Sequence, residues 1–167
     1  VRVYRNISGT LTQIGSDING ITDSLSGFSI ALAADGNIIA ISAPFNYENG
    51  SESGQVRVYS NLNGNWMQIG SSINGITGDE SGFSISLSSD GATLAIGCVG
   101  NHSNSLGRVR VYHNLVNNWT KIGGDIIGEA IGDKSGFSIS LSSDGTILAI
   151  GADFNNGNGI DSGHVRV

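Results

Sequence analysis

The sequence predicts an all-β fold of β-propeller blades, in three tandem four-stranded units of about 55 residues. Three motifs predict it, because they recur in the same order in every unit. Val-Arg-Val begins at positions 1, 56, 109 and 165, Ser-Gly-Phe-Ser-Ile at 26, 81 and 135, and Asp-Gly at 35, 90 and 144. The blades are therefore expected over residues 1–55, 56–108 and 109–164, and residues 165–167 begin a fourth unit.

Each unit is expected to hold four short strands, which are clearest in the second unit. Residues 56–59, Val-Arg-Val-Tyr, place both valines on one face, as in a half-buried strand. A second strand is expected over residues 66–73. Residues 83–88 alternate large apolar side chains with serine and predict the third strand. After Asp-Gly, whose residues tolerate positive φ in a hairpin turn, residues 93–97 return as the fourth.

The last two strands of each unit predict sheets that are covered on both faces. They alternate Phe, Ile and Leu with Ser, Ala and Gly, and lack the charged face of a solvated sheet. Blades stacked around an axis need a bulky face to meet a small-residue face, and each unit supplies both. Threefold repetition also fits a β-trefoil or a three-sheet β-prism, which remain alternatives at this point.

The assembled unit contains Gly-Phe-Ser, Asp-Gly, Ile-Ser-Ala-Pro at residues 41–44 and Gly-Gln-Val-Arg-Val-Tyr at residues 54–59. In these motifs the whole chain resembles the FG-GAP repeat of integrin-α-type β-propellers. It is still more similar to secreted microbial repeat proteins built on Gly-x-Val-Arg-Val-Tyr. The resemblance implies an extracellular or cell-surface propeller.

Integrin-type blades often hold calcium in an Asp-rich loop before the fourth strand. The corresponding loops here, residues 33–36, 88–91 and 142–145, contain one carboxylate each. Calcium takes about six to eight oxygen ligands, several of them anionic. We therefore expect no calcium and no other cofactor.

Composition argues against several classes of partner. The net charge is −6 with eight Lys and Arg, so no basic surface is expected for nucleic acid. No run of about 18 apolar residues occurs, so we expect no membrane span. Cys98 has no second cysteine for a disulfide. It takes the place of Ala43 and Ala152 and is expected to be a small core residue.

No residue set predicts catalysis, and we expect the chain not to be an enzyme. His102, His113 and His164 occupy unrelated repeat positions and are expected to be solvated. Asp79 and Glu80 are adjacent, whereas acid–base work needs carboxylates held across a pocket, so a turn explains them better.

Trp66 and Trp119 are the candidate ligand-stacking residues, since exposed aromatic rings stack on sugars and proteins. They share their repeat position with Leu11, which favours packing between blades instead. Candidate N-glycosylation sites follow from the Asn-x-Ser/Thr pattern. These sites are Asn6, Asn49, Asn101 and Asn118.

Three blades are fewer than the roughly four to eight of known propellers, and uncovered sheet faces favour association. The chain is expected to belong to a longer repeat array, to form half of a six-bladed ring, or to add head to tail. The predicted function is an extracellular structural repeat protein that self-associates, as a building block of a fibre or matrix. The alternative is a lectin-like or adhesin propeller that binds glycan or protein through loops such as residues 44–55.

Overall fold

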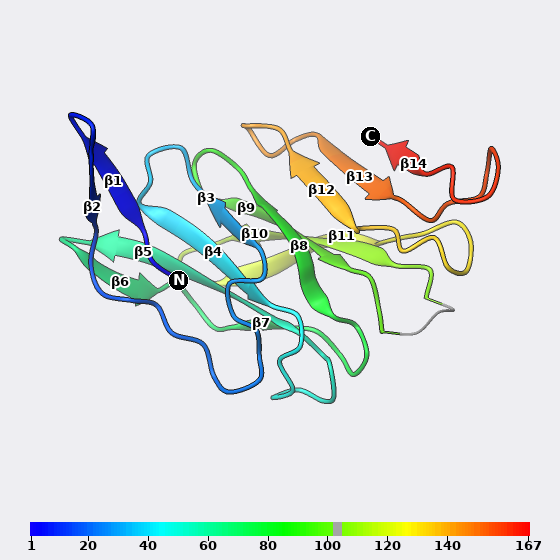
Figure 1. The fold of residues 1–167 in the computed structure, drawn as a ribbon, viewed down its shortest axis with the longest axis horizontal. Coiled ribbons are helices and arrows are strands. Elements are labelled where there is room, and N and C mark those ends of the chain that lie inside the picture. Colours follow the sequence, from blue (N-terminus) through cyan, green and yellow to red (C-terminus); the bar gives the residue numbers. More distant parts are fainter. Residues whose placement is uncertain (102–104) are drawn as a thin grey trace.

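The computed structural model describes residues 1–101 and 105–167, and within them every regular element is a β-strand. The strands form successive sheets along the chain, with β1–β2 and β12–β14 at opposite ends (Figure 1). The strands are β1 (Tyr4–Ile7), β2 (Thr10–Gln13), β3 (Ile30–Leu32), β4 (Ile38–Ala43), β5 (Gln55–Leu62), β6 (Asn65–Gln68), β7 (Ile73–Asn74), β8 (Ser81–Leu87), β9 (Thr93–Cys98), β10 (Arg108–Asn114), β11 (Trp119–Ile127), β12 (Ser138–Leu141), β13 (Leu148–Ala152) and β14 (His164–Arg166).

The sheets are offset from the sequence units by half a repeat. The sheet β11–β10–β9–β8 takes β8 and β9 from residues 56–108 and β10 and β11 from residues 109–164. This differs from the prediction, which placed all four strands of one unit in one sheet. Periodicity fixes the length of a repeat but not where a sheet begins. The antiparallel pairing of β9 with β10 shows that a sheet combines the last two strands of one sequence unit with the first two of the next.

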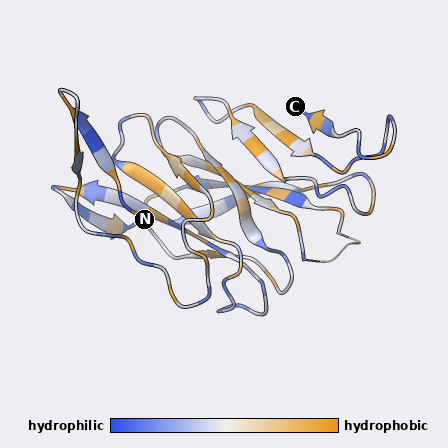
Figure 2. Ribbon diagram, viewed as in Figure 1, coloured by the Kyte–Doolittle hydropathy of each residue, from blue (hydrophilic) through white to orange (hydrophobic). Residues whose placement is uncertain are grey.

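The sheets stack face to face, with a bulky face on a small one. Leu94 and Ile96 of β9 pack against Ala40 of the preceding sheet. The opposite face of β9 carries Ala95, which is buried against Ile150 of the following sheet. This confirms the predicted pairing of faces. Figure 2 shows hydrophobic residues along β4 and along β12 and β13 at the C-terminal end.

Small residues let neighbouring sheets approach closely. A Cβ atom on Gly97 would lie 2.2 Å from the carbonyl oxygen of Gly136 in the next sheet, so only glycine fits there. The Ser84 hydroxyl donates to that same oxygen at 2.6 Å. The Leu141 N–H donates to the Ser86 Oγ at 2.9 Å. Serines on the small face therefore bind the backbone of the next sheet.

A chain of backbone hydrogen bonds also links equivalent turns of successive sheets. The Ala34 N–H donates to the Ser89 carbonyl at 2.9 Å, and the Ser89 N–H donates to the Ser143 carbonyl at 2.8 Å. The N–H group always belongs to the earlier sheet. The stack is therefore directional.

The stacking predicts that the same substitution, alanine to leucine, destabilises the fold at one position and hardly affects it at the equivalent position of the last sheet. Ala95→Leu should lower the free energy of unfolding by about 1–3 kcal/mol, because this fully buried side chain would be overpacked. Ala149→Leu, on the half-buried outer side of β13, should change it by less than about 0.5 kcal/mol. Urea unfolding of the two variants at low protein concentration measures the difference. Equal losses would contradict the stacking.

Candidate functional site

One end of the stack exposes three large hydrophobic residues, which we call the head face: Phe28, Ile30 and Leu32, at 46%, 56% and 49% exposure. Ile30 and Leu32 lie directly opposite Ile41 and Ile39 on the same sheet face. Val3 and Ile18 cover those two isoleucines. The sheet β1–β2 and its flanking residues therefore cover the part of this sheet that carries Ile39 and Ile41. The neighbouring part, which carries Ile30 and Leu32, stays open.

The other end exposes small residues, which we call the tail face. Ser138 pairs with Gly151 and Ser140 with Ala149, so these four side-chain positions share one face of the sheet. Both serines are exposed, and Ala149 and Gly151 are half-buried.

Head and tail match the two halves of a joint inside the stack. Between β8–β11 and β12–β14, a face of the tail's composition meets a face of the head's composition. The first face consists of Ser84, Ser86, Ala95 and Gly97, and the second of Phe137, Ile139 and Leu141. The molecule therefore displays, at opposite ends, two complementary surfaces.

A ladder of phenylalanine rings runs across the sheets. The ring centroids of Phe28 and Phe83 lie 5.1 Å apart, and those of Phe83 and Phe137 also lie 5.1 Å apart. Tilted pairs at this distance are favourable beyond their buried area. The sequence analysis did not assign a role to this ladder, although the repeated Ser-Gly-Phe motif signals it. Phe28 and Phe137 are both exposed, so the ladder is open at both ends.

Trp66 and Trp119 lie at joints between sheets. The Trp66 indole N–H donates to the Ile14 carbonyl at 2.9 Å, and the Trp119 indole N–H donates to the Ile69 carbonyl at 3.2 Å. Each tryptophan is half-buried, and its hydrogen bond links its own sheet to the preceding one. This position fits the packing that the shared position of Leu11 predicts.

The outer edges of the two indoles line equivalent shallow hollows at the rim. The first hollow has a volume of about 380 Å³ and includes Tyr59, Asn65 and Trp66. The second has about 230 Å³ and includes Tyr112, Asn118 and Trp119. An aromatic face beside an amide recurs at one repeat position, which is the arrangement closest to a ligand site.

A largely buried ion pair links the loop that precedes β8 to strands β10 and β11 of the same sheet. The Arg110 guanidinium contacts the Asp79 carboxylate at 2.6 Å and Asp125 at 3.1 Å, and both Arg110 and Asp79 are largely buried. Asp79 also accepts the Ile76 N–H at 3.1 Å, as expected of a turn. The sequence analysis identified the turn but missed the ion pair, whose signal was the Arg within every Val-Arg-Val.

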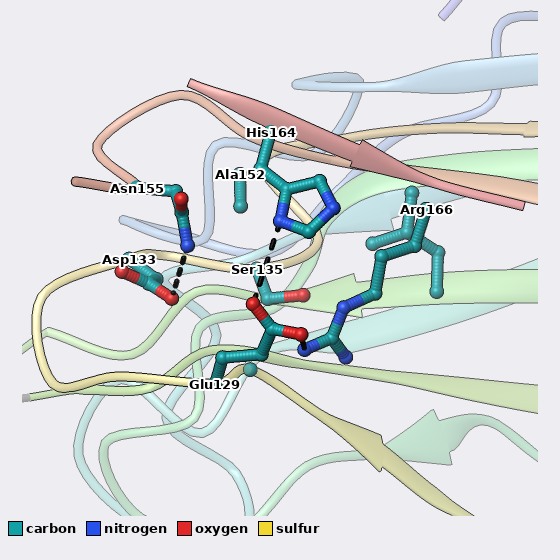
Figure 3. A pocket seen from close by; sticks show the side chains of 9 residues that line it. Glu129, Asp133, Ser135, Ala152, Asn155, His164 and Arg166 are labelled. Atoms are coloured by element: carbon teal, nitrogen blue, oxygen red, sulfur yellow. Dashed lines mark hydrogen bonds and ion pairs between the residues drawn. The ribbon is translucent and has the colours of Figure 1, made fainter. Parts of the chain in front are cut away.

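The equivalent position in the last unit forms a small pocket (Figure 3). Glu129 lies between His164, at 3.4 Å, and Arg166, at 2.6 Å, while the Asn155 amide donates to the Asp133 carboxylate at 2.9 Å. The accessible space, about 10 Å³, has room for about one water molecule. An organic ligand does not fit there.

The remaining candidates are explained by local structure. In each Asp-Gly turn the carboxylate accepts a hydrogen bond from the N–H two residues later, so it stabilises the turn. These bonds run from Asn37 to Asp35, from Ala92 to Asp90 and from Thr146 to Asp144. Burial raises the pKa of the Cys98 thiol to about 11, so it stays protonated as a core residue.

Two histidines can be placed: His113 lies 3.2 Å from the Thr93 hydroxyl, and His164 faces Glu129. His102 lies outside the described residues. Among the residues with described positions, no group of three His, Cys, Asp or Glu side chains could hold a metal ion. Nor does any helix there have the length and hydrophobicity to cross a membrane.

All four candidate glycosylation asparagines are exposed. Their side chains differ in availability. The Asn49 amide donates to the Gly75 carbonyl at 2.6 Å, and the Asn101 amide donates to Glu52. Asn6 accepts the Gly9 N–H within its turn, and the Asn118 amide makes a long contact of 3.5 Å to the Thr120 hydroxyl. Asn6 and Asn118 therefore have the freer amide groups.

Comparison with known proteins shows the fold and no family. No family model and no curated protein matches the chain. A solved structure from Bacteroides fragilis, provisionally assigned as a 6-phosphogluconolactonase, matches 78% of this chain and 34% of its own at 16% identity and a TM-score of 0.54. TolB from Acinetobacter baumannii matches 83% of this chain and 31% of its own at 17% identity and a TM-score of 0.44.

This chain thus spans about a third of the length of the solved chains that it matches. The likeness to the first of them and the stacked sheets identify the fold as β-propeller blades, as the sequence predicts. At 16% identity the likeness carries no statement about activity.

The buried ion pair predicts a large effect for one arginine and a small effect for its repeat equivalent. Arg110→Ala should lower the free energy of unfolding by about 2–3 kcal/mol, because Asp79 would stay buried with only Arg108, at 3.9 Å, near it. Arg2→Ala removes an exposed pair with Asp17 and should leave the unfolding midpoint unchanged. Thermal unfolding of both variants provides the measurement, and equal midpoints would refute a structural role for the buried pair.

Proposed function

We propose that this chain is an extracellular structural repeat module that works by self-association through its two end faces. The observation that supports this most directly is the match between the exposed head and tail faces and the joint between β8–β11 and β12–β14. Burying apolar side chains such as Ile30 and Leu32 is favourable by roughly 25 cal/mol for each Å² removed from water. The extracellular location rests on the resemblance to secreted repeat proteins.

The loops between the sheets are less suited to binding partners than the sequence suggests. Residues 44–55 contribute the buried side chains of Asn46, Ser53 and Gln55. The Glu80 N–H donates to the Glu52 carbonyl at 2.9 Å, so this loop contacts the next unit. Its interior positions are used for packing, which favours the structural role over binding through the loops.

A glycan-binding role is the second candidate, and the two rim hollows favour it. Each places a half-buried Trp beside an exposed asparagine, Asn65 or Asn118, and such aromatic and amide groups suit the apolar faces and hydroxyls of a sugar. Two equivalent hollows on one chain would bind a repeating glycan with avidity.

The structural role predicts concentration-dependent association. Light scattering coupled to size exclusion should show species heavier than the 17.2 kDa chain as concentration rises. Because the faces are apolar or uncharged, sodium chloride should have little effect and sulfate should strengthen association. A single 17.2 kDa species at every concentration would overturn the proposal.

The second candidate predicts saccharide binding at the rim. Calorimetric titration with a panel of oligosaccharides should give binding that the double variant Asn65→Ala, Asn118→Ala loses. Asn158→Ala, an exposed asparagine outside both hollows, serves as the control and should bind normally. No heat of binding across the panel would exclude the glycan-binding role.

A further inference from the structure

The two terminal sheets contain complementary parts of one four-stranded sheet. β1 and β2 are the repeat equivalents of β10 and β11, the outer strands of the sheet β8–β11. β12 and β13 are the equivalents of its inner strands, β8 and β9. The strand equivalent to β10 is present at both ends of the chain, since Val165-Arg166-Val167 at β14 repeats Val1-Arg2-Val3 before β1.

We infer that two copies of this chain join by a shared sheet, in which β12 and β13 of one copy pair with β1 and β2 of the other and β14 is displaced. This inference rests on the proposed self-association and specifies its geometry. The partner is a second copy of this chain, presenting its tail face to the head face.

The short pairing between β13 and β14 is consistent with the replacement of β14 by β1 of a second copy. β9 pairs with β10 over six residues, from Thr93 to Cys98. β13 pairs with β14 over only three, Ile150, Gly151 and Ala152. β1 is paired on one side, by β2, and its other edge is open among the described residues. Replacing β14 by the longer β1 would extend the ladder to Leu148 and Ile147.

The same placement covers the open half of the head face. In one copy, β1–β2 and its flanking residues cover Ile39 and Ile41, and the neighbouring Ile30 and Leu32 stay exposed. β12 and β13 of the second copy, joined to the edge of β1, would lie over these exposed residues. Ser140 would then take the place that Ser86 has inside the stack.

Polar groups at the two ends match as well. The inter-sheet hydrogen bonds leave the Ser143 N–H without a partner and the Ala34 carbonyl without a donor, among the residues that the structure places. In the shared joint the first would donate to the second. Phe137 would likewise reach Phe28 of the second copy and continue the phenylalanine ladder.

Two such joints between two copies would close a ring, and each joint forms one four-stranded sheet from β12, β13, β1 and β2, as in the sheet β8–β11. The joint is heterologous, because head meets tail, and such joints form rings when the rotation closes.

Two variants that each disable one face test the polarity of the joint. Ile30→Arg disables the head and Ser140→Arg the tail; both positions are exposed, so each variant should fold, as circular dichroism verifies. Wild type should have twice the chain mass of 17.2 kDa. Each variant alone should be monomeric, and an equimolar mixture should regain a one-to-one dimer. Leu62→Arg, equally exposed at the tip of β5, should dimerise like wild type.

A disulfide tests the register. In the shared sheet, position 5 would face position 147, as His113 faces Thr93. Arg5→Cys combined with Ile147→Cys should give a disulfide-linked dimer on mild oxidation. The control Thr12→Cys with Ile147→Cys places one thiol a strand farther out and should link at least tenfold more slowly.

The outcomes separate the two proposals. A wild-type monomer overturns the self-association itself. A wild-type dimer in which either variant still dimerises alone, or in which the mixture stays monomeric, overturns the head-to-tail joint only. Equal disulfide yields in the two cysteine pairs overturn the shared sheet, and oligomers larger than two copies overturn the closed ring.

Discussion

The close approach of consecutive sheets is the constraint on which the rest of the structure depends. A side chain larger than hydrogen at Gly97 would meet the next sheet, and Ala95 is fully buried against Ile150 of that sheet. Leu94 and Ile96 on the reverse of the same strand fill the space toward the preceding sheet. A strand that is bulky on one side and small on the other stacks repeatedly without voids. The alternation within a single strand therefore determines how all the sheets are arranged.

A joint made of two unlike faces gives the stack a direction. The backbone hydrogen bonds between turns and the Ser84 hydroxyl bond to Gly136 both point from the earlier sheet to the later one. A directional stack cannot have identical ends. The exposed Ile30 and Leu32 at one end and the exposed serines at the other are therefore the unpaired counterparts of faces that pair with each other inside the stack.

Sequence periodicity predicted most of the strands, the blade architecture and the pairing of faces, because these depend on side-chain alternation within short segments. The strand expected over residues 66–73 is instead broken into β6 and β7, which pair with different parts of β5. The phase of the sheets could not be predicted, since four repeated strands can be grouped in several ways and only the β9–β10 hydrogen bonds distinguish them. The ion pair between Arg110 and Asp79 escaped prediction for a similar reason. Its partners are 31 residues apart, and a turn and a strand each explained one of them separately.

The arginine of each Val-Arg-Val contacts the segment that leads into its own sheet, and its partner differs from sheet to sheet. Arg57 donates to the Asn19 carbonyl at 3.1 Å, ahead of β3, whereas its repeat equivalent Arg110 pairs with Asp79, ahead of β8, and Arg166 pairs with Glu129, ahead of β12. An arginine that lost its partner where the group is desolvated would be costly to the fold. The apolar faces thus provide the contact between sheets, and the arginines hold the connecting segments against their own sheets.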